Sequence, residues 1–510
     1  MRIRADVPTS YQQFVSVIRR YDREATLLGL STLLGKWTGH THDESGRQFP
    51  FLPWSVAGLA TTMIGRGYSG GIHPILEDLH TLTHMYSNLA HPVDENDPLA
   101  GLRLISRFVY QQWPFTRHSG SDWARPTALF VDTPFPDGYT PEAMTEGWAE
   151  ELLGADVGTF VSVGFILRAA AGNGSRYPFE WEQGILDVLK LVGGQDQFDA
   201  IVRANYVTTI DAFKAARRTA VSAAAGTPGA QFLREPFAYN PLFSTPLIEG
   251  ILPGFAIGPC LPAIALKTSA LGIIYKGLER WGVAFTHDVG KLFEAYIGRQ
   301  LNSRGDWFVV PEITYGLRGN LQSVDWFVVT ERYVVLIECK AALPTAAMRE
   351  GSDDFLDAHV IKLDKSIKQL NKSRKLILDR APEFATIPAD LQMVGLSVTL
   401  GNFDMANEPF IRSEMTLAHF PVAVVGVDFL EWFVTLSTTE LDATLAEALS
   451  TEQRGIFEPR WLMQDMVVAG NPLLARAFEE IPVHARLIAS GNVASNLDPA
   501  SNDEVGATGQ

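Results

Sequence analysis

Two carboxylates and one ammonium group lie on neighbouring stretches of the sequence that have the composition of β-strands. Asp325 lies within residues 322–329, and Glu338 and Lys340 close residues 333–340. Both stretches are rich in valine and aromatic residues, which favour strands. Adjacent carboxylates can hold a divalent cation, and a lysine beside them can stabilise negative charge. This combination is typical of a site for metal-assisted chemistry.

A turn at Glu331 and Arg332 would fix the register of the predicted hairpin. The numbers of opposed residues then sum to 663, which places Asp325 opposite Glu338 with Cβ atoms ~4.5 to 5.5 Å apart. Strand alternation adds Lys340 to the same face. Like charges there cost stability, so we expect both a divalent cation and the Lys340 ammonium to neutralise them. Toward the turn this face is apolar, with Phe327, Val329, Val334 and Leu336.

The expected ligand set suits a small hard cation. Two monodentate carboxylates, a backbone carbonyl and water molecules match Mg2+, or Mn2+ in the same site. Mg2+ keeps part of its hydration shell, and substrate phosphates commonly complete its coordination. The pattern therefore predicts a phosphodiester substrate.

The residues also resemble a known signature. Val324-Asp325 followed by Ile337-Glu338-Cys339-Lys340 resembles the D...(D/E)xK motif of the PD-(D/E)xK, or restriction-endonuclease-like, nucleases, with valine where the older motif name has proline. Residues 290–296, which include Glu294, are similar to the first helix of that family, and residues 365–370, which include Gln369, to its glutamine-bearing helix. The order of these elements is the family's order. The resemblance covers about residues 286–400.

The resemblance implies a metal-dependent nuclease, with DNA as the expected substrate. Asp325, Glu338 and the carbonyl of Cys339 would hold Mg2+ or Mn2+. Glu294 would bind a second ion or position the attacking water. The ion would polarise the scissile phosphate and lower the pKa of that water.

Two further residues complete the site that the resemblance implies. Lys340 would orient the water and stabilise the developing negative charge. Gln369 would fix Lys340 or a phosphate. The expected catalytic residues are thus Glu294, Asp325, Glu338, Lys340 and Gln369.

The charge distribution bears on a nucleic-acid partner. The 510-residue chain has a net charge of −16, which repels polyanions unless basic residues are concentrated locally. Residues 285–381 are nearly neutral, with 14 basic and 13 acidic residues. A lysine stripe on the helix expected at 355–380 could neutralise a phosphate backbone, although such a stripe is more often a solvated face. It consists of Lys365, Lys368, Lys372 and Lys375.

Hydrophobic periodicity predicts an α+β multidomain protein: a large α-helical N-terminal region followed by an α/β restriction-endonuclease-like domain with a mixed central sheet. Strands are expected at 307–315, 322–329, 333–340, 393–400 and 422–429. Residues 247–266, the longest apolar stretch, are interpreted as buried loop and helix. The expected segments are a helical domain of unknown role (1–222), a Pro/Gly-rich connector with helices (223–284), the nuclease-like domain (285–435), C-terminal helices (436–489) and a disordered tail (490–510).

Composition excludes several other classes of protein. The two cysteines, Cys260 and Cys339, rule out a disulfide framework and a four-cysteine zinc site within one chain. The first residues do not have the pattern of a secretory signal, so we expect a cytoplasmic protein without a membrane partner. The sequence does not indicate an oligomeric state.

Two other interpretations stay open. The nuclease fold could be catalytically inactive and act as a module that binds nucleic acid or a protein partner, with the helical region as the interaction surface. Alternatively, the strand segment could match the signature by chance, in which case Asp325, Glu338 and Lys340 would not converge. A nuclease with a large helical appendage suggests defence against foreign DNA, by analogy only.

Overall fold

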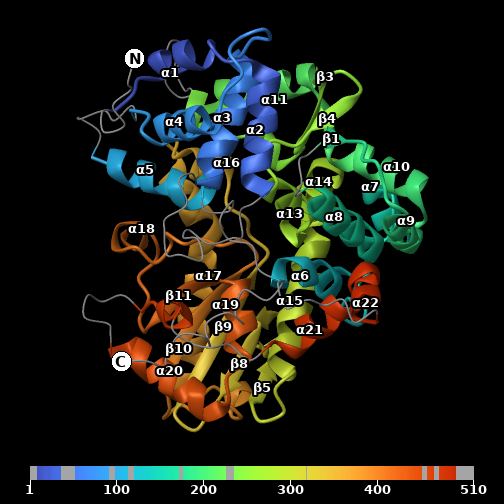
Figure 1. The fold of residues 1–510 in the computed structure, drawn as a ribbon. Helices are drawn as coiled ribbons and strands as arrows, with labels where there is room; N and C mark the ends of the chain where they lie inside the picture. Colours follow the sequence, from blue (N-terminus) through green and yellow to red (C-terminus); the bar gives the residue numbers. More distant parts are fainter. Residues whose placement is uncertain are drawn as a thin grey trace, which may run out of the picture.

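Helices predominate over strands in the computed structural model of the protein, which confirms the mixed α+β class (Figure 1). The structure describes residues 8–35, 52–90, 98–112, 120–171, 176–224, 235–317, 319–450, 457–464 and 470–489. The expected disordered tail and most of the small-residue segment after residue 222 lie outside these ranges.

The first part of the chain is helical, as its periodicity predicts. Its α-helices are α1 (Tyr11–Ile18), α2 (Arg23–Gly35), α3 (Pro53–Arg66), α4 (Leu76–Ser87), α5 (Ala100–Arg107), α6 (Gly120–Phe130), α7 (Trp148–Leu153), α8 (Val157–Ala171), α9 (Gln183–Leu189), α10 (Gln195–Asn205) and α11 (Ile210–Ala224). The short helices between them are η1 (Phe108–Gln112) and η3 (Lys190–Val192), followed later by η4 (Glu235–Phe237) and η5 (Pro241–Phe243).

A small sheet corrects the interpretation of residues 247–266 as loop and helix. This segment forms two antiparallel strands before helix α13 begins. Gly250 and Gly254 have φ angles of 85° and 80°, which allow the irregular pairing and the tight turn between the strands. The sheet has the order β1-β4-β3-β2, with β1 (Arg176–Tyr177), β2 (Val207–Thr209), β3 (Leu247–Leu252) and β4 (Phe255–Ile257).

A five-stranded mixed sheet carries the residues of interest. Its order is β11-β10-β9-β8-β5, in which β5, β8 and β9 are antiparallel neighbours and β9, β10 and β11 run parallel. The strands are β5 (Phe308–Pro311), β8 (Trp326–Val329), β9 (Tyr333–Lys340), β10 (Gln392–Thr399) and β11 (Val422–Gly426), beside a short hairpin of β6 (Thr314–Tyr315) and β7 (Leu321–Gln322). The predicted strand at 422–429 is too long, because helix α19 begins at Val427.

Helices cover both faces of this sheet. Helix α15 packs against one face of β9 and α17 against the other, so the arrangement has three layers. The helices from this point on are α13 (Pro262–Thr268), α14 (Ala270–Trp281), α15 (Val283–Asn302), α16 (Ala346–Glu350), α17 (Phe355–Leu378), η6 (Pro382–Phe384), α18 (Pro409–Ser413), α19 (Val427–Phe433), α20 (Thr438–Ser450), η7 (Pro459–Gln464), α21 (Pro472–Glu479) and α22 (Pro482–Ala489).

The hairpin register predicted from the sequence is confirmed. Trp326 pairs with Ile337, and Phe327 pairs with Leu336, so that each pair of numbers sums to 663. The predicted apolar face is also present, because Phe327 and its neighbours on β9 are buried against α17.

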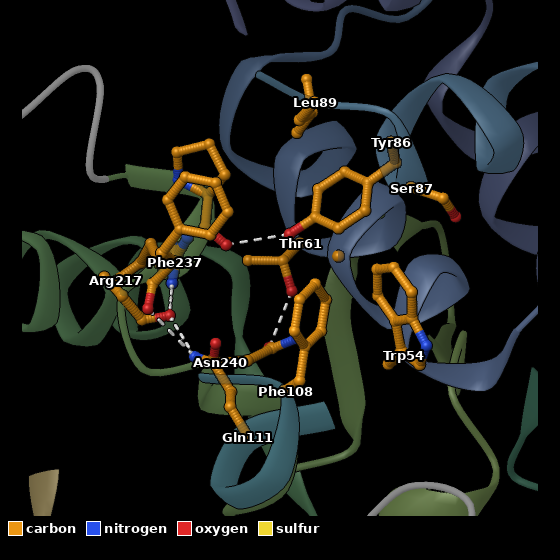
Figure 2. Close-up of a pocket in the computed structure, with 13 residues that line it drawn as sticks. Trp54, Thr61, Tyr86, Ser87, Leu89, Phe108, Gln111, Arg217, Phe237 and Asn240 are labelled. Atoms are coloured by element: carbon orange, nitrogen blue, oxygen red, sulfur yellow. Dashed lines mark hydrogen bonds between the residues drawn. The ribbon is translucent and has the colours of Figure 1, made fainter. Parts of the chain in front are cut away.

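A pocket in the helical part lies between α3, α4 and η1 (Figure 2). Trp54, Tyr86 and Phe108 form its aromatic wall. Its polar groups are satisfied internally: the Tyr86 hydroxyl donates to the Pro236 carbonyl at 2.9 Å, and Arg217 donates to backbone carbonyls. The pocket therefore presents no convergent reactive groups.

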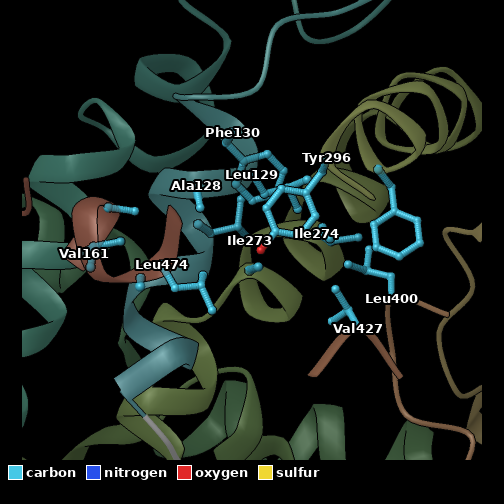
Figure 3. Packing of buried hydrophobic residues seen from close by; sticks show 14 of the residues in the cluster. Ala128, Leu129, Phe130, Val161, Ile273, Ile274, Tyr296, Leu400, Val427 and Leu474 are labelled. Carbon is cyan, nitrogen blue, oxygen red and sulfur yellow. The ribbon is translucent and has the colours of Figure 1, made fainter. Parts of the chain in front are cut away.

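The main apolar core is shared by the N-terminal helices and the sheet (Figure 3). Leu129 of α6, Ile273 of α14 and Leu474 of α21 belong to the same cluster as residues of β9 and β10. The stretch Trp148–Ala171 has the length and composition of a membrane span, but 61% of its apolar window is buried in this core, and it turns at Gly154 between α7 and α8. We assign it to the core.

A buried ion pair connects α6 to the helix that follows the sheet. Arg125 donates to both carboxylate oxygens of Glu431 at 2.7 Å, and the Tyr296 hydroxyl donates to the same carboxylate at 2.7 Å. The two charged side chains are only 7% and 3% exposed. Planar guanidinium and carboxylate groups match in this bidentate geometry.

Replacing Glu431 by glutamine should destabilise the protein by about 3 kcal/mol, because the Arg125 guanidinium would stay buried without its principal counterion. Denaturant unfolding measures the change. Glu480→Gln is the matched control, since Glu480 pairs with Arg476 on the surface and an exposed pair contributes at most about 1 kcal/mol. Equal losses in the two variants would contradict the structural role of the Arg125–Glu431 pair.

Candidate active site

Asp325 and Glu338 meet where the β8–β9 ladder ends. Thr330 and Tyr333 form a hydrogen-bonded pair beside the turn, so alternation along the hairpin makes Asp325 and Glu338 a closely spaced pair without mutual backbone hydrogen bonds. The backbone N–H of Cys339 donates to Asp325 Oδ2 at 2.6 Å, so the carboxylate takes a donor at the point where the ladder stops. The two acids therefore lie side by side.

Lys340 completes the predicted group. Its ammonium donates to Glu338 Oε1, while Glu338 Oε2 is buried and has no hydrogen-bond partner among the described residues. Glu338 is only 5% exposed. The three side chains therefore converge. If the strand segment matched the signature only by chance, they would not do so.

The pKa values of both acids are raised. Burial, and then the neighbouring Asp325 carboxylate, raise the pKa of Glu338 to about 8 against the opposing effect of Lys340. Burial also raises the pKa of Asp325, although the Cys339 N–H opposes it. Burial lowers the pKa of Lys340, but the Glu338 carboxylate outweighs it, so the net change is upward. Ionising both acids in this place requires additional positive charge.

Glu294 lies at the edge of this group, on α15. Its carboxylate accepts from Lys291 at 3.0 Å, and its charge contributes to raising the pKa of Asp325. The backbone carbonyl of Glu294 also accepts from the indole N–H of Trp326 at 3.3 Å, which ties α15 to the start of β8. The structure therefore brings Glu294 near the two acids.

Glu312, a residue that sequence reasoning missed, extends the row of acids. Pro311 pairs with Trp326, so the next position along β5 places Glu312 opposite Asp325. Burial, followed by the charges of Asp325 and Glu294, raises the pKa of Glu312 to about 7. Only the register between β5 and β8 could have indicated this position of Glu312. No short turn connects the two strands, so the sequence does not fix that register.

Gln369 holds the backbone before Asp325 and does not contact Lys340. Its amide donates to the carbonyls of Gln322 at 3.0 Å and Ser323 at 2.6 Å. One turn further along α17, the Ser373 hydroxyl accepts from the N–H of Val324 at 2.9 Å. Helix α17 thus fixes the path of the chain into the site, and Gln369 has a positioning role.

The predicted lysine stripe on α17 is exposed but partly neutralised. Lys368 pairs with Asp364 at 2.6 Å, and Lys375 pairs with Asp379. Lys372 lies 5.2 Å from the centre of the Tyr315 ring. Lys365 and Lys372 form no ion pair with the described residues.

The residues present fit a divalent cation. Within the described ranges, Asp325 Oδ1 accepts no hydrogen bond, and Glu338 Oε2 is unpartnered and buried. No three histidine, cysteine, aspartate or glutamate side chains of those ranges already surround a common point. Two oxygens on adjacent carboxylates nevertheless suit Mg2+, which takes one or two carboxylates and completes its shell with water and phosphate. The carbonyl of Cys339 stays a predicted ligand.

Comparisons of the chain with protein-family models, with curated proteins and with solved structures find no match.

Cation binding should release protons. Mg2+ ligands must be ionised, whereas the raised pKa of Glu338, about 8, keeps its carboxyl largely protonated at pH 7 in the metal-free protein. We expect release of about one proton at pH 7 and an affinity that rises up to about tenfold per pH unit until pH 8. Isothermal titration calorimetry in two buffers of different ionisation enthalpy measures both.

Glu338→Gln should abolish this proton release, while Glu331→Gln, at the exposed turn of the same hairpin, should preserve it. A Mg2+ affinity that does not change between pH 6 and pH 8 would contradict the expectation.

Proposed function

We propose that the protein is a metal-dependent nuclease that hydrolyses phosphodiester bonds of DNA. The observation that carries the proposal is the buried, unpartnered oxygen of Glu338 beside the open oxygen of Asp325, with Lys340 in contact. A buried carboxylate oxygen without a partner is costly. A divalent cation would offset that cost.

The order of the elements along the chain also supports the proposal. Helix α15 with Glu294 comes first, then β5, then Asp325 immediately before β8, then Glu338 and Lys340 on β9, and finally α17. Strand β10 then returns parallel to β9. This is the element order that the resemblance to PD-(D/E)xK nucleases implies.

Each side chain of the group has a chemical role in the proposed reaction. Bound Mg2+ would polarise the scissile phosphate and lower the pKa of a coordinated water. Asp325 and Glu338 would hold the ion, and Glu294, whose charge acts on Asp325, would accept a proton from the attacking water. Lys340 supplies ammonium donors toward the charge that develops on the phosphate. Gln369 keeps Asp325 in place through the backbone.

Plasmid nicking in the presence of Mg2+ tests the proposal. Asp325→Asn and Lys340→Met should each lower the nicking rate by about 10³-fold or more, because each removes part of the charge compensation at the transition state. Glu331→Gln changes the same charge at the exposed end of the hairpin and should keep the wild-type rate. Circular dichroism and thermal unfolding verify that each variant is folded.

Two results would end the proposal. The first is nicking that survives in both folded site variants, which would locate the activity elsewhere. The second is a wild-type protein that binds plasmid but does not nick it with Mg2+ or Mn2+, which would favour the non-catalytic binding module. A role in defence and a protein partner for the helical region stay predictions from the sequence.

A further inference from the structure

Four large apolar side chains lie on the surface where α3 is connected to the start of α4. The exposed fractions are 58% for Tyr68, 60% for Ile72, 64% for Ile75 and 56% for Leu76. Single exposed apolar residues are ordinary on a protein surface, whereas a contiguous group marks an interaction site. We refer to these four residues as the apolar patch.

Backbone hydrogen bonds to the α1–α2 turn hold the first half of the patch in place. The N–H of Arg23 donates to the Tyr68 carbonyl at 2.9 Å. The N–H of Asp22 donates to the Ile72 carbonyl at 2.8 Å, and the Ile72 N–H donates to the Arg20 carbonyl at 2.8 Å. Tyr68 and Ile72 are therefore bound to the same turn.

Tyr21 joins this half of the patch to the second half. It forms a β-bridge with Ile72, and its hydroxyl donates to Asp78 Oδ1 at 3.0 Å. The other carboxylate oxygen of Asp78 accepts from the N–H of Ile75 at 3.0 Å. Ile75 and the adjoining Leu76 are thus fixed beside Ile72, and the patch is one continuous surface.

The patch is large enough to supply the apolar part of a protein interface. Four large side chains that are more than half exposed offer on the order of 400 Å² of apolar surface, which is the size of patches that are often functional. A standard interface buries about 800 Å² per partner, and a little more than half of that area is apolar. The patch would account for most of it.

The charges around the patch balance each other. Residues 19–24 and 68–77 contain three basic and three acidic residues, whereas the whole chain has a net charge of −16. The Arg19 guanidinium lies 5.3 Å from the centre of the Tyr68 ring, and Glu77 is exposed directly after the patch. Neither Arg19 nor Glu77 forms an ion pair with the described residues. The border of the patch therefore offers charges of both signs for pairing.

This charge balance favours a second copy of the chain as the occupant. Two chains of net charge −16 repel each other, and the repulsion is least where the local charge is zero. In a two-fold contact the patch meets itself, so a basic group on one border can pair with an acidic group on the other. An anionic lipid surface would require an excess of basic residues, which the border lacks.

We propose that the apolar patch is the interface of a two-fold symmetric homodimer. The four apolar side chains of one copy pack against the same four of the other, and Arg19 and Glu77 pair across the border. Figure 1 shows α1 to α4 at the upper end of the molecule and the five-stranded sheet at the lower end, so the dimer keeps the two candidate active sites far apart. The inference does not depend on the proposed nuclease function.

Sedimentation velocity of the full chain from about 1 to 100 µM tests the dimer. The wild-type protein should shift from monomer to dimer in this range. Ile72→Asp/Leu76→Asp should raise the dimer Kd at least about 30-fold, because it places unpaired charges in the apolar contact. Leu417→Asp is the matched control, since Leu417 is 73% exposed between α18 and β11 and should not affect association. Thermal unfolding verifies that each variant is folded.

Charge reversal tests the two-fold symmetry. Glu77→Arg makes the border positive and Arg19→Glu makes it negative, so each variant should dimerise more weakly than the wild type at about 50 mM salt. An equimolar mixture of the two should regain dimerisation, because the borders then carry opposite charges. Stronger association of Glu77→Arg alone would mean that the patch binds an acidic surface elsewhere on the second copy, and would overturn the two-fold contact.

Two other results would overturn the inference. The first is a wild-type protein that stays monomeric up to about 100 µM, or an Ile72→Asp/Leu76→Asp variant that dimerises like the wild type. The second is a monomeric wild-type protein that sediments with vesicles of phosphatidylcholine and phosphatidylserine while the double variant does not, which would assign the patch to a membrane.

Discussion

The structure depends on two carboxylates, those of Asp325 and Glu338, which the sheet holds next to each other. Strand β9 is an interior strand, with β8 on one side and β10 on the other. Its backbone is therefore fixed, and Glu338 stays where the ladder puts it. Opposite β9, the backbone that leads to Asp325 is held by Gln369 and Ser373 of helix α17. Because neither acid can withdraw, their charge has to be compensated by Lys340, by protons or by a cation.

The hairpin was predictable because its information is local. A two-residue turn and strict alternation determine which side chains face each other, and both can be read from a dozen residues. The position of Glu312 was not predictable in this way, since the β6–β7 hairpin lies between β5 and β8 and no turn length fixes their register. Helix α3 is not visible as an amphipathic period in the sequence for another reason: it is buried on nearly all sides.

Side-chain pairing is only partly visible in a sequence. The pairs of Lys368 with Asp364 and of Lys375 with Asp379 follow helical spacing, and that spacing already favoured a solvated face for the stripe. The contact of Gln369 with backbone carbonyls has no such signal, because it joins a helix to a segment about 46 residues away. The same applies to Arg125 and Glu431, which are 306 positions apart. Long-range polar contacts of this kind need the tertiary structure.

The bridge between Arg125 and Glu431 has a consequence for modularity. Helix α19 directly follows the last strand of the large sheet, and its buried acid is neutralised by a residue of the distant N-terminal half. A gene fragment that encoded only the sheet and its flanking helices would leave that acid unmatched and expose the apolar side of α15. Recombination that transplants the sheet into another protein must therefore carry α6 with it, or supply another arginine at the same place.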